Sequence, residues 1–348
     1  MTVVNVIEML EPEPSPLWAV VAQAGVREVV TMLEGAEQGA RFRISKTGEA
    51  PALPPLAPRG QRPWDKEPLL ALKQRYADHG FRLIAVEDTA PMDKIRLGLP
   101  GRDEQISHVI DQIQAMGACD IRLLCYNWMA VTSWARTDTA VPLRGGALGS
   151  GFDNAINEAL PPLVEPGSVT ADQLWEGLDY FLQAVVPVAQ ESGVVLGLHP
   201  DDPPLPTIRG VPRIASSIEA YRRVMSLVDS PANAITLCQG NFTLMTDDLP
   251  SVIREFGTAG RIAFVHFRDV RGTVESFVET FHDEGKTDLA ACMRAYHEVG
   301  FTGPLRPDHV PTLAGEDNSR PGYADLGRLF AVGYIKGLRE MAYGREKR

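Results

Sequence analysis

The sequence has little cysteine, with four in 348 residues, and no two of them form a CxxC pair. This sparseness excludes a disulfide framework and favours a reducing compartment, so we expect a cytoplasmic protein. Apolar runs of about 18 residues, the length of a membrane span, are also missing. The first residues, MTVVNVIEMLEPEPSP, contain neither a basic region nor a long apolar segment, so we expect no signal peptide or membrane anchor.

Positive charge is scarce as well. The 34 Lys and Arg residues are outnumbered by 45 Asp and Glu residues, which leaves a net charge of -11. Because proteins that bind duplex nucleic acid or anionic membranes usually carry a basic face, we expect neither partner. The composition, 44% hydrophobic and 23% charged, is typical of a globular protein with a large core.

Helical and strand patterns alternate along the chain, and a glycine follows most of the expected helices, as at a left-handed C-terminal cap. We expect strands at 3–9, 28–32, 81–86, 121–126, the apolar start of 194–204, 234–237, 262–267 and 305–309. Eight such strands predict an α/β fold, the (β/α)8 TIM barrel. A doubly wound sheet is less favoured because no glycine-rich dinucleotide loop follows the first strand. We expect one barrel domain over 1–348, with irregular insertions near 34–63 and 135–168 that serve as a lid or an interface.

Polar residues stand at the carboxyl ends of these strands. The stretch 194–204, VVLGLHPDDPP, changes from buried-strand residues to His199, Asp201 and Asp202. Because strand ends converge on one pocket in a barrel, similar ends elsewhere belong to the same site. They are Glu87, Asn127, Cys238, His266 with Arg268, and Arg306 with Asp308 and His309.

Four of these strand ends predict a metal site. The two histidines, the cysteine and the aspartate of strands five to eight form a set of metal ligands: His199, Cys238, His266 and Asp308. Each residue alone has a structural explanation, since buried cysteine behaves as a small hydrophobe and Asp often caps a turn. Because all four residues stand at equivalent ends of consecutive strands, a shared metal site is favoured over four separate structural roles. Imidazole and carboxylate suit Mn²⁺ or Fe²⁺, and thiolate favours Fe²⁺, Co²⁺ or Zn²⁺, so the ligands leave the metal open.

Several motifs resemble the mannonate dehydratases of hexuronate catabolism, whose barrel is similar to that of xylose isomerase. They are CYNWMAVTSWARTD at 125–138, LHPDDPP at 198–204, GVPRI at 210–214, TLCQG at 236–240, VHFRD at 265–269, RPDH at 306–309 and RPGYADLGRL at 320–329. The resemblance implies a xylose isomerase-like TIM barrel and a divalent metal, Mn²⁺ before Fe²⁺ or Co²⁺, on the four residues named above. It also implies acid–base roles for His309 and Tyr323, a homo-oligomer such as a dimer, and conversion of a sugar acid, D-mannonate, to 2-keto-3-deoxygluconate.

This chemistry needs a base for the weakly acidic C2 proton and an acid for the departing 3-hydroxyl. Histidine ordinarily titrates near neutral pH, so we assign His309 as the base and Tyr323 as the acid, although the roles can be exchanged. Arg268 and Arg306 offer forked donors for the substrate carboxylate, with structural ion pairing as the alternative. Asn127, Asp201 and His282, which lies in the loop after the seventh strand, complete the expected substrate-binding set.

The resemblance weakens in the first strands and in the loops that should recognise the sugar. Family residues are replaced in NVIEMLEPEPSP, TMLEGAEQGARF, RPDHVPT and FHDEGKTDL. Alternative functions are therefore a metal-dependent sugar isomerase or epimerase, a related lyase on another polyhydroxy acid, and a non-catalytic binding homologue. A metal-dependent nuclease is least favoured because of the acidic charge.

Overall fold

The computed structural model describes residues 3–33 and 56–344, and its centre is a parallel sheet of nine strands in the order β1-β15-β12-β11-β8-β5-β4-β3-β2. At one end of this order, β1 (Asn5–Val6) pairs with β15 (Pro304–Pro307). At the other end, β2 (Glu8–Met9) pairs with β3 (Glu28–Thr31). Because only Ile7 separates β1 from β2, they are halves of one strand and the sheet closes. The predicted (β/α)8 TIM barrel is thus confirmed.

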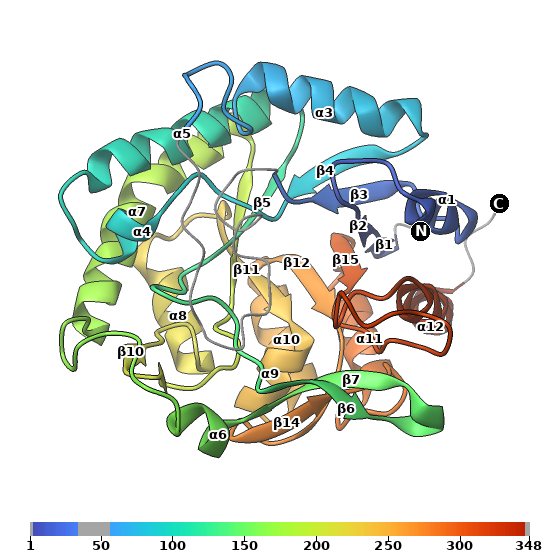
Figure 1. Ribbon diagram of the computed structural model, residues 1–348. Coiled ribbons are helices and arrows are strands. Elements are labelled where there is room, and N and C mark those ends of the chain that lie inside the picture. The colour runs from blue at the N-terminus through green and yellow to red at the C-terminus, as the bar shows by residue number, and fades with distance from the viewer. Residues whose placement is uncertain (1–2, 34–55, 345–348) are drawn as a thin grey trace.

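The other barrel strands lie within two or three residues of the expected ranges: β4 (Arg82–Val86), β5 (Leu123–Asn127), β8 (Val195–His199), β11 (Asn233–Cys238) and β12 (Ile262–Phe267). Helices surround the barrel (Figure 1): α1 (Pro16–Gln23), α3 (Lys66–Asp78), α5 (Arg102–Ala118), α7 (Ala171–Ser192), α8 (Ile218–Leu227), α10 (Leu249–Thr258), α11 (Leu289–Glu298) and α12 (Asp325–Tyr343). Short elements complete the loops: α4 (Asp93–Arg96), β9 (Thr207–Ile208), β10 (Val211–Pro212) and α9 (Gln239–Met245). No helix in residues 3–33 and 56–344 has the length and apolar character to cross a membrane.

Local signals set the ends of several helices. At the start of α7, the side chains of Thr170 and Gln173 form a capping box, as the sequence pattern predicts. The same helix ends at Gly193, whose φ of 64° is the left-handed conformation that glycine tolerates best. At the start of α8, the hydroxyl of Ser217 accepts the Ala220 N–H, so Ser217 caps this helix.

Apolar side chains fill the barrel below its polar end. Ile7, Val30, Leu123 and Phe264 are buried in this inner cluster, and the ring of Tyr323 closes it from above. A larger layer packs between the sheet and the helices, as in other barrels. Since apolar residues occupy the interior, polar groups gather only at the carboxyl ends of the strands.

A second sheet covers that end. It contains β6 (Asp138–Pro142), β7 (Leu148–Asp153), β13 (Val270–Gly272) and β14 (Ser276–Glu279), in the antiparallel order β13-β14-β7-β6. The segment 135–168, expected to be irregular, supplies β6, β7 and the short helix α6 (Asn154–Glu158). Because β7 contains glycines and β6 is mostly exposed, neither segment shows the alternation of apolar and polar residues that would predict a strand. Of the other expected insertion, 34–55 lies outside the described residues.

Candidate active site

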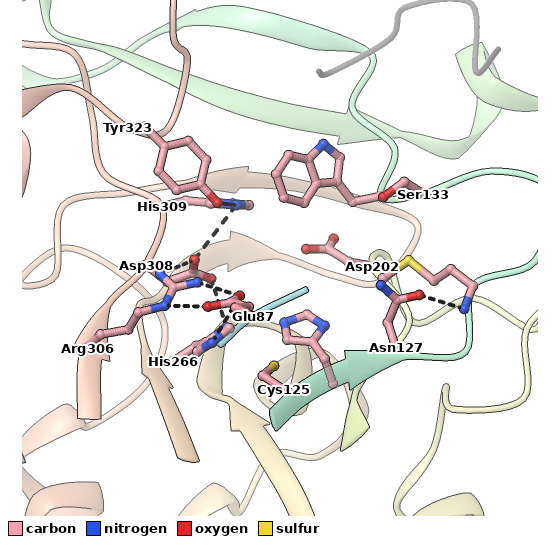
Figure 2. A pocket seen from close by; sticks show the side chains of 13 residues that line it. Glu87, Cys125, Asn127, Ser133, Asp202, His266, Arg306, Asp308, His309 and Tyr323 are labelled. Carbon is pink, nitrogen blue, oxygen red and sulfur yellow. Dashed lines mark hydrogen bonds and ion pairs between the residues drawn. The ribbon is translucent and has the colours of Figure 1, made fainter. Parts of the chain in front are cut away.

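A pocket opens among the carboxyl ends of β4, β5, β8, β12 and β15 (Figure 2). The structure brings together most of the residues predicted from strand ends, since Glu87, Asn127, His199, His266, Arg306, Asp308 and His309 all line it. Tyr323, which the family resemblance implies, lines it too. Further lining residues are Cys125, Met129, Ser133, Trp134 and Asp202. Cys238 lies just behind this lining, with its Sγ 3.7 Å from Asp308 Oδ2.

Three of the four predicted metal ligands form a compact cluster. Ligand atoms of His199, Cys238 and His266 all lie within 4.8 Å of one another. Asp308 lies beside them, with Oδ2 3.8 Å from His266 Nδ1. A thiolate, two imidazoles and a carboxylate make a donor set suited to a divalent transition metal.

The ring nitrogens of the two histidines also fit a metal. His199 Nδ1 donates to the carbonyl of Pro200 at 2.7 Å, which leaves Nε2 with its lone pair, the arrangement typical of a metal-bound histidine. Burial lowers the pKa of His199, so the ring stays neutral and able to coordinate. His266 is buried, and both of its ring nitrogens face carboxylates, with Nε2 3.3 Å from Glu87 Oε1 and Nδ1 3.8 Å from Asp308 Oδ2. A cation in this cluster would bind one of these nitrogens through its lone pair, and the other nitrogen would face a carboxylate.

A second group, Glu87, Cys125 and His266, also has metal-ligand spacing. Its carboxylate is already paired, since Arg306 donates to both oxygens of Glu87, at 2.8 and 3.1 Å. Burial raises the pKa of the Cys125 thiol well above its ordinary value, and its sulfur accepts a hydrogen bond from Thr236. The ion pair does not separate the two groups, because Asp308 is also paired, with Arg268 and Arg306. The raised pKa of Cys125 does separate them, since the thiolate is the form that binds metal, and it favours the cluster with Cys238.

The two predicted acid–base residues touch each other at the mouth of the pocket. His309 Nε2 lies 3.0 Å from the Tyr323 hydroxyl. Burial raises the pKa of Tyr323 well above its ordinary value, so the phenol remains protonated. Trp134 packs edge-on against the imidazole, with centroids 5.3 Å apart, and stacks on the phenol ring at 6.2 Å. These contacts restrict both rings.

Arg268 and Arg306, predicted to bind the substrate carboxylate, are both engaged by carboxylates of the protein. All three nitrogens of Arg268 are paired, with Asp308, Glu279 and Asp202 at 2.8 to 3.0 Å. It does not line the pocket, so the ion-pair alternative describes it. Arg306 does line the pocket, and it donates to Glu87 and to Asp308 at 2.8 to 3.1 Å.

Two other expected substrate contacts do not reach the pocket lining. Asp201 accepts the Ala215 N–H at 2.7 Å and faces Arg213, so it closes the loop after β8. His282 donates from Nε2 to the carbonyl of Phe267, and burial lowers its pKa to about 4. The contacts of both side chains are with the protein itself, which supports structural roles, and their predicted contact with the substrate stays a prediction.

Several site residues were not singled out from the sequence. Trp134 and Arg136 lie inside the stretch CYNWMAVTSWARTD, and that motif was the signal that could have identified them. Asp202 was noticed in LHPDDPP, and it pairs with Arg136 at 2.6 and 3.0 Å. Glu279 has no comparable signal, because it belongs to the second sheet and not to a barrel strand.

Comparison with known proteins gives consistent relatives. The D-mannonate dehydratase (UxuA) family model matches residues 18–164 and 165–348. Mannonate dehydratase 2 of Halalkalibacterium halodurans is 36% identical over 303 residues, which cover 80% of this chain and 87% of that protein. The mannonate dehydratase of Thermotoga maritima is 35% identical over 319 residues, 82% of this chain and 88% of that protein.

Solved structures agree with the sequence comparison. The crystal structure of mannonate dehydratase from Streptococcus suis serotype 2 superposes with a TM-score of 0.85 and 28% identity, covering 100% of this chain and 97% of that one. An L-ribulose 3-epimerase superposes with a TM-score of 0.58 and 14% identity, over 98% of this chain and 96% of that one. At that identity, the second likeness concerns the fold alone.

Proposed function

Because this chain belongs to the mannonate dehydratase family, we propose that it eliminates water from D-mannonate to give 2-keto-3-deoxy-D-gluconate. The observation that supports this most directly is the contact between His309 Nε2 and the Tyr323 hydroxyl, in the same pocket as the candidate metal ligands. A base and an acid beside a cation are what removal of a C2 proton and a C3 hydroxyl requires.

His199, Cys238, His266 and Asp308 would hold the metal, and we propose Mn²⁺, with Fe²⁺ and Co²⁺ as alternatives. A divalent cation bound there would stabilise the negative charge that develops on the substrate as C2 loses its proton. The buried charges around the pocket favour a cation, because three arginines face four carboxylates: Arg136, Arg268 and Arg306 against Glu87, Asp202, Glu279 and Asp308.

In the proposed reaction, His309 Nε2 takes the C2 proton and Tyr323 gives its phenolic proton to the 3-hydroxyl, which leaves as water. The resulting enol gains a proton at C3 and loses one from the 2-hydroxyl, which produces the keto acid. The 3.0 Å contact then allows the His309 imidazolium to return a proton to the Tyr323 phenolate, so both side chains regain their starting protonation states. Because burial keeps Tyr323 protonated, the assignment of Tyr323 as acid is preferred to the reverse one.

The test is an assay of the purified protein with Mn²⁺ and D-mannonate, alongside a panel of other aldonic and uronic acids. We expect a keto acid that is lighter than the substrate by one water, measured by mass spectrometry and NMR. A product of unchanged mass would overturn the proposal in favour of an isomerase or epimerase. If no acid reacts, the dehydratase proposal fails and the binding homologue is supported.

Two substitutions test the assigned residues. His309→Asn and Tyr323→Phe should each lower kcat at least about 100-fold, because each removes one proton transfer. The bound metal, measured by elemental analysis, should not change. His297→Asn and Tyr180→Phe are matched controls on the exposed surface and should keep the parent kcat. Parent activity in either site variant would refute its role.

A further inference from the structure

We propose that Glu279 is a positioning residue that holds the His309 imidazole with Nδ1 protonated and Nε2 unprotonated, so that Nε2 can take the substrate proton. The inference rests on the function proposed above for His309. Glu279 Oε1 is in hydrogen-bond contact with His309 Nδ1, while the other ring nitrogen faces Tyr323. Arg136 Nη2 also lies 3.4 Å from Nδ1, but the Glu279 carboxylate is closer to this nitrogen. The two ring nitrogens thus have different main partners, a carboxylate at Nδ1 and a hydroxyl at Nε2.

The partners of Glu279 determine which nitrogen carries the proton. Arg136 and Arg268 donate to Oε1 at 2.6 and 3.0 Å, and Ser150 donates its hydroxyl to Oε2. Burial opposes ionisation, but Arg136 and Arg268 hold the pKa of Glu279 well below its ordinary value. An ionised carboxylate can only accept hydrogen bonds, so Nδ1 must be the donor. A neutral ring then has its lone pair on Nε2, which is the atom a general base needs.

The second sheet brings this carboxylate to the site. Glu279 is the last residue of β14, and Ser150 lies on the neighbouring strand β7; Figure 1 shows these strands side by side along one side of the barrel. The approach is close, since a Cβ at Gly149 would lie only 2.6 Å from the Glu279 carbonyl oxygen. Glycine at this position therefore allows β7 to pack against the strand that carries the carboxylate.

A purely structural role would predict different results. In that case Glu279 would serve only to neutralise Arg136 and Arg268, and its loss would lower stability without changing the tautomer of His309. The discriminating measurement is therefore the protonation of the two ring nitrogens, read from the ¹⁵N chemical shifts of histidine-labelled protein. Magnesium replaces manganese for this experiment because it does not broaden the signals, and His309→Asn assigns them.

The test compares Glu279→Gln with Glu275→Gln, the same change at an exposed position of the same hairpin. An amide can donate as well as accept, so Glu279→Gln should shift His309 toward the Nε2-protonated form. It should lower kcat about 10- to 100-fold, with KM within about threefold and unchanged metal content, as for other residues that orient a site histidine. The control should match the parent in both measurements.

Glu279→Asp keeps the charge, so it should retain the Nδ1-protonated ring and lose less activity than Glu279→Gln. If the glutamine variant does not fold, an Nε2-protonated ring in Glu279→Asp would overturn the proposal. A parent-like tautomer in a folded Glu279→Gln would overturn it too, whatever the activity. If the parent converts no sugar acid, the proposed function fails, while the tautomer measurement still decides whether Glu279 positions His309.

Discussion

Arg306 and Glu87 form an ion pair with two hydrogen bonds, of 2.8 and 3.1 Å, that joins β15 to β4 across the mouth of the barrel. Both side chains are buried, and β15 and β4 are not neighbours in the sheet. The pair therefore ties together two strands that backbone hydrogen bonds do not connect.

Glu87→Gln should lower the free energy of unfolding by about 3 kcal/mol or more, because it leaves the buried Arg306 charge without its main partner. Urea denaturation of the metal-free protein measures this. Glu298→Gln is the control, since it removes the carboxylate from an exposed pair with Arg254 and should leave stability unchanged. Equal effects of the two changes would contradict the prediction.

Asp202 should make stability depend on pH in the acid range. Burial opposes its ionisation, but Arg136 and Arg268 lower its pKa to about 2, from an ordinary value of 3.8. A lowered pKa stabilises the folded state above pH 3.8, and this contribution, about 2 kcal/mol, disappears as the pH falls through about 2. The stability advantage of the parent over Asp202→Asn, from urea titrations, should therefore narrow below pH 4. A constant difference would refute this account.

Cys238→Ala should abolish the rise in melting temperature that Mn²⁺ causes. A ligand that binds only the folded state stabilises it by about 2.7 kcal/mol at 100 times its Kd, and loss of one donor weakens that binding. Thermal unfolding with and without Mn²⁺ gives the shift. The comparison variant is Cys119→Ala, whose thiol contacts the Lys66 carbonyl outside the pocket, and it should keep the full shift. A full shift in Cys238→Ala would show that the metal binds elsewhere.

Asn127→Ala should raise KM for the sugar acid about tenfold, with a smaller change in kcat. Its Oδ1 accepts the Met129 N–H at 3.0 Å, so the amide nitrogen is left to donate to a substrate oxygen (Figure 2). Loss of one such hydrogen bond corresponds to about 1.4 kcal/mol. Steady-state kinetics check this, with metal content as the control. An unchanged KM would remove Asn127 from the binding site.

Much of the barrel was predictable because its signals are local. The expected strand 262–267 coincides with β12, since the pattern of apolar residues along a segment depends only on its own sequence. The second sheet was not predictable in this way. Its outer strands β6 and β13 are largely exposed and pair only with their neighbours in local hairpins. The sheet forms because β7 pairs with β14, and these two strands are more than 100 residues apart in the chain.

Within the site, the candidate metal ligands could be predicted from the sequence, but the ion pairs and hydrogen bonds of the residues around them could not. His199, Cys238, His266 and Asp308 could be selected from the sequence, because each follows an apolar strand and strand ends of a barrel converge. The sequence could not show that Arg268 is held by three carboxylates, or that Asp201 and His282 turn to nearby backbone.

The sequence by itself determined the barrel and the kind of chemistry at its mouth, because hydrophobic periodicity and strand-end residues are properties of single segments. Tertiary structure alone decided how the charges pair. Arg136 and Glu279 are 143 residues apart in the chain and 2.6 Å apart in the fold. Ion pairs of this kind depend on the packing of the second sheet over the barrel, and no local pattern encodes that distance.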